Sequence, residues 1–159
     1  MPHRPVSVSR VIAARPEAVF AIVADPSRHP EIDGSGMLRA SMDGPAPLQL
    51  GSTFSMRMRQ FGMPYSMVNT VTELEPDRRI AWLPAALVAG RQVAGGATWR
   101  YEITPTDGGC TVVETYDITT AMGSQVLALL RYPEKMAEAM AATLDRLAKV
   151  AESEQAPTP

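Results

Sequence analysis

The residue of this chain best suited to acid–base chemistry is Glu114, and a turn signal predicts its neighbours. Asp107-Gly108 predicts a two-residue hairpin turn, because Asp and Gly tolerate the positive φ values that such turns need. If Thr106 pairs with Gly109, Glu114 lies opposite Tyr101 on one face of a sheet. The other pairs expected on that face are Ile103 with Val112 and Trp99 with Tyr116.

A carboxyl group surrounded by aromatic rings, as expected for Glu114, could bind a ligand or transfer a proton. Burial disfavours the charged form and raises the pKa, so Glu114 could hydrogen-bond a ligand hydroxyl or move a proton from an enolisable carbon. Plainer interpretations stay open. The carboxyl could be satisfied by Tyr101, Tyr116 or a basic side chain, it could lie in water near the strand end, or a strand bulge could reverse its facing.

Asn69 is a second polar candidate, because it shares a face with Tyr65 and Met67 if that strand is regular. The ten methionines of the chain suit an adaptable apolar wall, since the thioether chain is flexible and polarisable, and they suit ordinary core filling equally well. The aromatic residues Trp82, Trp99, Phe54 and Phe61 also fit a plain core. The residues expected to contact a ligand are Phe54, Met56, Met58, Tyr65, Met67, Asn69, Trp82, Trp99, Tyr101, Tyr116, Met136 and Met140.

Other catalytic chemistries have weak support in the sequence. A zinc site needs three or four ligands at suitable spacing, and the His and Cys residues of the chain are His3, His29 and Cys110. Residues 34–37 lack the pattern that exposes a catalytic serine, and residues 90–96 follow no nucleotide-binding spacing. We therefore expect neither a metal nor a cofactor.

Two single residues receive structural interpretations. Cys110 cannot form an intramolecular disulfide, because it is the only cysteine, and it is expected to be a small packed residue beside a turn. His29 could act as an acid or base near neutral pH. Its position between Arg28 and Pro30 in a short connection instead predicts that it is exposed to solvent.

The composition limits the classes of partner. A length of 159 residues fits one domain, and a net charge of −2 leaves no excess of positive charge for a phosphate backbone, so nucleic acid is not an expected partner. The sequence has no run of about 20 apolar residues and no apolar stretch typical of a secretory signal. We therefore expect a soluble, cytoplasmic protein that does not insert into membranes.

The elements that must position these residues follow from periodicity and turn signals. Alternation predicts a first strand from Val6 to Ile12, and Pro16 opens a helix that Asp25-Pro26 ends, with room for one more short helix in residues 27–33. Residues 84–96, rich in Ala and Gly, read as a mobile connection. Further strands are expected near residues 37–43, 51–60, 64–75, 78–84, 96–105 and 110–119.

The C-terminal part of the chain predicts a long amphipathic helix. It extends from after Gly123 to about Glu152, with Pro133 either opening the main helix or kinking a longer one. One side of this helix carries a stripe of apolar residues. This stripe must be buried, and the apolar face of the sheet is the only sizeable partner for it. The residues of the stripe are Met136, Met140, Leu144, Leu147 and Ala151.

This order of elements resembles the START/polyketide cyclase superfamily, also called SRPBCC proteins. Residues 8–14 followed by 16–20 look like the opening strand and first helix of that family, and residues 24–26 with 29–31 look like its second helix. Residues 73–82 and 99–116 look like its later hairpins. The resemblance implies a cavity between sheet and helix, in a superfamily whose members bind lipids, sterols, polyketides, quinones or plant hormones and in part catalyse aromatic cyclisation or dehydration.

We therefore expect an α+β helix-grip fold, in which a curved antiparallel seven-stranded sheet surrounds a long C-terminal helix and two short helices follow the first strand. Residues 1–152 form the single ligand-binding domain and residues 153–159 a flexible tail. The leading functional hypothesis is binding of a small hydrophobic molecule. One alternative is a cyclase or dehydratase that uses Glu114 and a tyrosine, and another is a protein-interaction module or homodimer.

Overall fold

A curved antiparallel sheet and a long helix make up most of the protein. The computed structural model describes residues 3–42 and 44–155. The strands are β1 (Val6–Ile12), β2 (Leu38–Met42), β3 (Thr53–Gln60), β4 (Met63–Glu75), β5 (Arg79–Val88), β6 (Arg91–Gly95), β7 (Thr98–Thr106) and β8 (Gly109–Asp117). The helices are α1 (Pro16–Val23), the 3-10 turn η1 (Pro26–Arg28), α2 (His29–Ile32), α3 (Ser124–Leu129) and α4 (Tyr132–Gln155).

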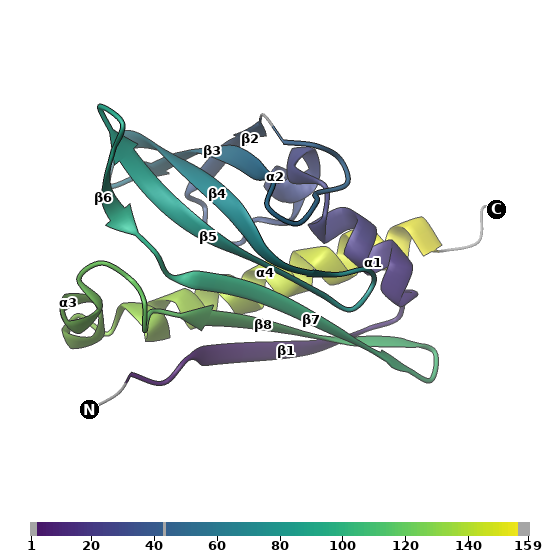
Figure 1. Ribbon diagram of the computed structural model, residues 1–159. Helices are drawn as coiled ribbons and strands as arrows, with labels where there is room; N and C mark the ends of the chain where they lie inside the picture. Colours follow the sequence, from purple (N-terminus) through teal and green to yellow (C-terminus); the bar gives the residue numbers. More distant parts are fainter. Residues whose placement is uncertain (1–2, 43, 156–159) are drawn as a thin grey trace.

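The strand order confirms the helix-grip fold. It reads β1-β8-β7-β5-β4-β3-β2, with every pair antiparallel. The sheet curls so that α4 crosses its concave side, while α1 and α2 lie near the C-terminal end of α4 and α3 lies at the other end (Figure 1). Within the described part of the chain, no helix has the length and apolar character needed to span a bilayer.

The hairpin of β7 and β8 has the register that the Asp107-Gly108 turn predicts. Thr106 pairs with Gly109, and Tyr101 pairs with Glu114. The pairs Ile103 with Val112 and Trp99 with Tyr116 are also present. A local turn signal is enough here, because one turn of fixed length determines the facing of every residue in both strands.

The stretch 84–96 is not a plain connection, which corrects the sequence interpretation. β5 continues to Val88 and returns as β6, so an eighth strand joins the seven expected ones in the described sheet. The turn between them places Ala89 and Gly90 at φ values of 50° and 75°. Backbone pairing, such as Ala85 with Gly95, forms this hairpin although Ala and Gly favour strands weakly.

The long helix begins where Pro133 predicts. Arg131, at φ 53°, separates α3 from α4, and Pro133 is the second residue of α4, so the proline opens the main helix and does not kink a longer one. The five residues of the predicted apolar stripe are all buried.

The helix ends three residues later than expected, at Gln155. Contacts with the first helices account for this extension: Glu154 pairs with Arg28, and Gln155 accepts a hydrogen bond of 3.1 Å from Arg15 Nε. Residues 153–155 therefore belong to the helix and not to a tail. The expected flexible tail at 156–159 lies outside the described residues.

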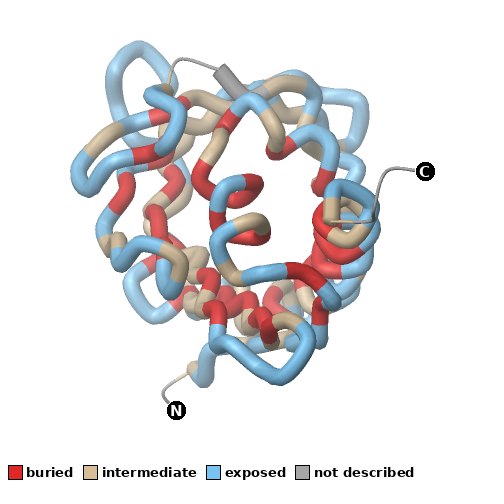
Figure 2. Tube along the Cα trace, turned by 90° about the vertical axis from the view of Figure 1, so that its right-hand side faces the viewer, coloured by how far each residue is buried: buried red, intermediate tan, exposed pale blue. Residues whose placement is uncertain are grey.

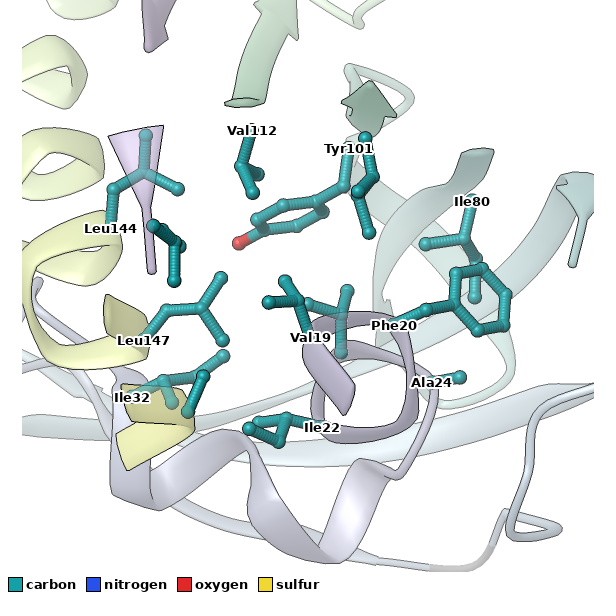
Figure 3. Packing of buried hydrophobic residues seen from close by; sticks show 14 of the residues in the cluster. Val19, Phe20, Ile22, Ala24, Ile32, Ile80, Tyr101, Val112, Leu144 and Leu147 are labelled. Carbon is teal, nitrogen blue, oxygen red and sulfur yellow. The ribbon is translucent and has the colours of Figure 1, made fainter. Parts of the chain in front are cut away.

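The filled core lies where α1 meets α4 and the sheet. Val19 of α1 and Leu147 of α4 face one another, with the ring of Tyr101 above them and Ile22 below (Figure 3). Buried segments of strands and helices face the interior, and exposed segments surround them (Figure 2). Burial of these apolar side chains is the main force that holds the helices on the sheet.

Candidate functional site

A cavity of about 610 Å³ lies between the sheet and the N-terminal half of α4. Its deep wall includes Asn69 and Glu114, which are almost fully buried. At the other end the wall includes Val88, Val93 and Met122, which are more than half exposed. The cavity therefore opens to solvent beside β6 and the segment before α3.

Twelve of the thirteen side chains expected at a site line this one cavity. They come from β3, β4, β5, β7, β8 and α4, so the fold brings together residues that are far apart in the sequence. Alternation along each strand explains this, because every second side chain points to the concave face. These residues are Met56, Met58, Tyr65, Met67, Asn69, Trp82, Trp99, Tyr101, Glu114, Tyr116, Met136 and Met140.

Phe54 is the exception and corrects the predicted set. It is 1% exposed and belongs to the solid core, not to the cavity wall. Its ring meets Trp82 edge to face with centroids 5.4 Å apart, and it meets His29 in the same way at 5.3 Å. Phe54 has the facing that alternation predicts, but the rings of Trp82 and His29 occupy the space in front of it. Phe61, also considered for the core, is 95% exposed.

Glu114 is buried at the deep end of the cavity. Its side chain is 2% exposed, and the hydroxyl of Tyr101 donates a hydrogen bond of 2.8 Å to Oε1. Burial raises the pKa of Glu114 to about 8, the hydrogen bond from Tyr101 opposes this shift, and the charge of Asp33 adds to it. The carboxyl is therefore mostly protonated at pH 7.

The tyrosines around Glu114 are neutral donors at the same pH. Burial raises the pKa of Tyr101 well above its ordinary value, and the nearby carboxyl of Glu114 adds to the shift. Burial also raises the pKa of Tyr116, whose ring lies 4.5 Å from that of Trp99. The rings on the cavity wall form two contact groups, one that contains Trp82 and Tyr101 and one that contains Trp99, Tyr116 and Tyr132.

His29 is buried, contrary to the expectation from its neighbours. It is 4% exposed, its Nε2 lies 2.7 Å from the carbonyl oxygen of Val23, and its ring stacks on Trp82 with centroids 5.3 Å apart. Because a carbonyl can only accept, Nε2 carries a proton. Burial lowers the pKa of His29, so the ring is neutral at pH 7.

Asn69 has a structural role besides its place on the wall. Its side-chain nitrogen donates a hydrogen bond of 3.3 Å to the carbonyl oxygen of Phe54 on the neighbouring strand. This bond ties the side chain to the β3–β4 pair and leaves the amide oxygen and the second N–H as the groups that a ligand could meet.

Two parts of the wall carry no signal in the sequence. Asp33 follows α2 and uses both oxygens to hold the next turn: Oδ1 accepts from the backbone N–H and the hydroxyl of Ser35, and Oδ2 accepts from the N–H of Leu38. In the sequence, the residues around Asp33 indicate only an ordinary turn. The mouth residues Leu87, Val88 and Val93 lie on the β5–β6 hairpin, which the sequence interpretation had treated as a connection.

Solved structures with this architecture cover nearly the whole chain. Protein CV1439 from Chromobacterium violaceum is 19% identical, with a TM-score of 0.71 over 96% of this chain and 99% of that one. Protein NE0264 from Nitrosomonas europaea is 17% identical, with a TM-score of 0.73 over 96% and 97%. The di-domain ARO/CYC StfQ from the steffimycin biosynthetic pathway is 16% identical, with a TM-score of 0.69 over 95% of this chain and 51% of that one.

Sequence comparison identifies relatives that are longer than this chain. Rv0088 of Mycobacterium tuberculosis strain H37Rv is 40% identical over 117 residues, and MT0096 of strain CDC 1551 is 39% identical over the same length. The matched part is 73% of this chain and 48% of each relative, so the chain spans about half the length of the curated relatives that it matches.

The family model described as "polyketide cyclase / dehydrase and lipid transport" matches residues 3–152. This match confirms the resemblance to the START/polyketide cyclase superfamily that the opening strand, the first helices and the later hairpins suggest. The chain belongs to the polyketide cyclase/dehydrase and lipid transport family.

Proposed function

We propose that this protein binds a small hydrophobic molecule in the cavity beneath α4. The observation that carries the proposal is a cavity of about 610 Å³ with apolar walls and one buried carboxyl at its deep end. Small-molecule sites in proteins span roughly 300–1,000 Å³ and combine apolar walls with a few placed polar groups. The cavity fits this description.

The comparisons support a ligand-binding or cyclase role without indicating one ligand. The family description names polyketide cyclase, dehydrase and lipid transport, and StfQ is an ARO/CYC protein of a biosynthetic pathway. All of these activities require an organic molecule to enter a protein interior. The ligand-contacting residues of this chain are therefore proposed to be the twelve cavity-lining residues named above.

A dye titration with paired helix variants tests the proposal. Ala139 of α4 lines the cavity, whereas Ala141 is exposed on the same helix. We expect wild-type protein and Ala141→Phe to bind the neutral apolar dye Nile red with the same affinity, and Ala139→Phe to lose binding at least tenfold. Equal binding by both variants, or no binding by the wild type, would contradict the proposal. Native mass spectrometry of protein purified from its source would show any copurifying molecule.

A cyclase or dehydratase activity is the second candidate, favoured by the contact between Tyr101 and Glu114. A carboxylic acid that is protonated at neutral pH can donate its proton to a substrate oxygen, and the Tyr101 hydroxyl 2.8 Å away would stabilise the carboxylate left behind. With an identified substrate, Glu114→Gln should lower kcat by at least 100-fold. Unchanged turnover would remove Glu114 from the reaction.

The remaining sequence expectations stay predictions. A homodimer or a protein-interaction role would appear as a concentration-dependent mass in light scattering after size exclusion. A cytoplasmic location and the lack of a nucleic-acid partner would be checked by fractionation of cells and by a binding titration with duplex DNA.

A further inference from the structure

One buried polar atom at the deep end of the cavity has no partner. Among the described residues, Oε2 of Glu114 is the only buried side-chain nitrogen or oxygen without a hydrogen bond. Buried polar atoms in native proteins nearly always have a protein or water partner. Because Glu114 lines the cavity, a molecule in the cavity can supply the missing partner.

The contact with Tyr101 determines which kind of partner Oε2 needs. Tyr101 is neutral, so its hydroxyl donates to Oε1 and occupies that oxygen as an acceptor. The pKa of Glu114 near 8, which results mainly from burial, means that the carboxyl carries a proton at pH 7. With Oε1 accepting, the proton lies on Oε2, and Glu114 offers a donor to the ligand.

The charged groups on the cavity wall disfavour anionic ligands. The wall residues of the cavity include two carboxyl groups, Asp33 and Glu114, and among those described there is no Lys or Arg. His29 is neutral at pH 7 because burial lowers its pKa. Arg100, on the opposite face of β7, is held by Glu73 in a two-point ion pair. An anionic ligand would therefore lose its hydration and find no cation in return.

We propose that the cavity selects uncharged ligands that present an acceptor oxygen, such as a ketone, ester or amide carbonyl, to the proton on Glu114 Oε2, and that it rejects carboxylates of equal size. This inference rests on the proposed function, because it requires that the cavity binds a small molecule. It makes Glu114 a specificity-determining residue whether or not a reaction follows.

Three matched naphthalenes test the inference. 2-Acetylnaphthalene presents a carbonyl, 2-naphthoate presents a carboxylate, and 2-ethylnaphthalene is one heavy atom smaller than the ketone and has no polar group. In displacement of Nile red from wild-type protein at pH 6.5, we expect 2-acetylnaphthalene to bind at least tenfold more tightly than 2-naphthoate and about fivefold more tightly than 2-ethylnaphthalene. A hydrogen bond from a buried donor accounts for the second difference, and the uncompensated charge for the first.

The pH dependence gives a readout without any substitution. Other titratable groups on the wall are His29, Asp33, Tyr65, Tyr101, Tyr116 and Tyr132. At pH 9 Glu114 has lost its proton and can no longer donate, so the preference for the ketone over 2-ethylnaphthalene should fall below twofold. Tyr101 stays protonated at pH 9 because burial raises its pKa, so the change reports on Glu114.

Two substitutions distinguish the effect of the Glu114 proton on ligand binding from the effect of the side chain's shape. Glu114→Leu should bind the ketone and 2-ethylnaphthalene equally at both pH values. Glu114→Gln should keep the preference for the ketone, because an amide also donates, and should lose its pH dependence. Glu75→Gln, on an exposed residue at the end of β4, is the control and should match the wild type.

The outcomes distinguish the two levels of the proposal. If the three naphthalenes displace the dye equally at pH 6.5, or if 2-naphthoate binds best, the inference is overturned while binding in the cavity stands. If none of them binds and Nile red does not bind either, both the proposed function and the inference are overturned.

Discussion

The two halves of α4 cover very different interiors. The C-terminal half presents Leu144, Leu147 and Ala151 to a solid core, against Val19 and Ile22 of α1 (Figure 3). The N-terminal half presents Met136 and Met140 to the cavity. The same apolar stripe of α4 therefore packs against a solid core in its C-terminal half, the filled half, and lines the cavity in its N-terminal half, the hollow half.

The difference comes from what lies opposite the helix. At the filled half, α1 inserts its apolar face between α4 and the sheet, and four of its residues are buried. At the hollow half, α3 has no buried residue and does not insert in the same way. A helix-grip sheet is wider than one helix can fill, so the presence or absence of a second apolar helix decides where a cavity remains.

Truncation of the stripe should have its largest effect in the filled half. Leu147→Ala should lower the free energy of unfolding by about 4 kcal/mol, because it removes a fully buried side chain and leaves a new void. Met136→Ala should cost about 2 kcal/mol, because the burial free energy of the removed atoms is lost while no new void forms beside the existing cavity. Urea unfolding monitored by circular dichroism measures both values. Equal losses would show that the hollow half is packed in solution.

The carboxyl in the hollow half should make stability depend on pH. Folded Glu114 keeps its proton up to about pH 8, whereas in the unfolded chain it ionises near its ordinary value of 4.5. Between these values the folded state binds more protons, so the wild type loses stability as the pH rises through this window. Glu114→Gln has no such loss.

The free energy of unfolding of Glu114→Gln relative to the wild type should therefore increase by about 4 kcal/mol from pH 4.5 to pH 9, with little further change above pH 9. Urea unfolding at pH 4.5, 7 and 9 gives the difference, and His29 affects both proteins alike. A constant difference across this range would mean that Glu114 is ionised and solvated at neutral pH.

Larger side chains on α4 should also affect the stability of the two halves differently, although by less than truncation does. Ala148→Leu inserts three carbons into the filled half and should cost about 2 kcal/mol through overpacking. Ala139→Leu on the cavity wall should change the free energy of unfolding by less than about 0.5 kcal/mol and weaken dye binding. Similar destabilisation of both variants would contradict the contrast between the halves.

Local signals predicted more of the fold than of the site. The Asp107-Gly108 turn is sufficient for the register of Tyr101 and Glu114, because the geometry of a two-residue turn is independent of the rest of the chain. The amphipathic period of α4 likewise needs only the helix itself. These features can be predicted from the sequence because they depend only on residues that are neighbours in the chain.

The misplaced residues depend on partners far away in the sequence. His29 lies between Arg28 and Pro30, which suggest exposure, yet Trp82 of β5 covers its ring. Phe54 has the predicted facing, but its position behind Trp82 depends on how β3 and β5 are offset. The volume of the cavity is a property of packing, which no periodicity encodes.

The smallest predicted effect concerns the turns at the open end of the hollow half. Phe61 and Ala89 each precede a glycine at a hairpin tip and adopt positive φ values of 52° and 50°, which strain a residue with a Cβ. Asn tolerates this conformation better than Phe or Ala, so Phe61→Asn and Ala89→Asn should each raise the free energy of unfolding by about 0.5 kcal/mol. Neither residue lines the cavity, so dye affinity should stay within twofold of the wild type. Urea unfolding and the Nile red titration measure the two quantities. A loss of stability in Phe61→Asn alone would show that its exposed ring packs against something in solution, and the open end would then be covered where the structure leaves it bare.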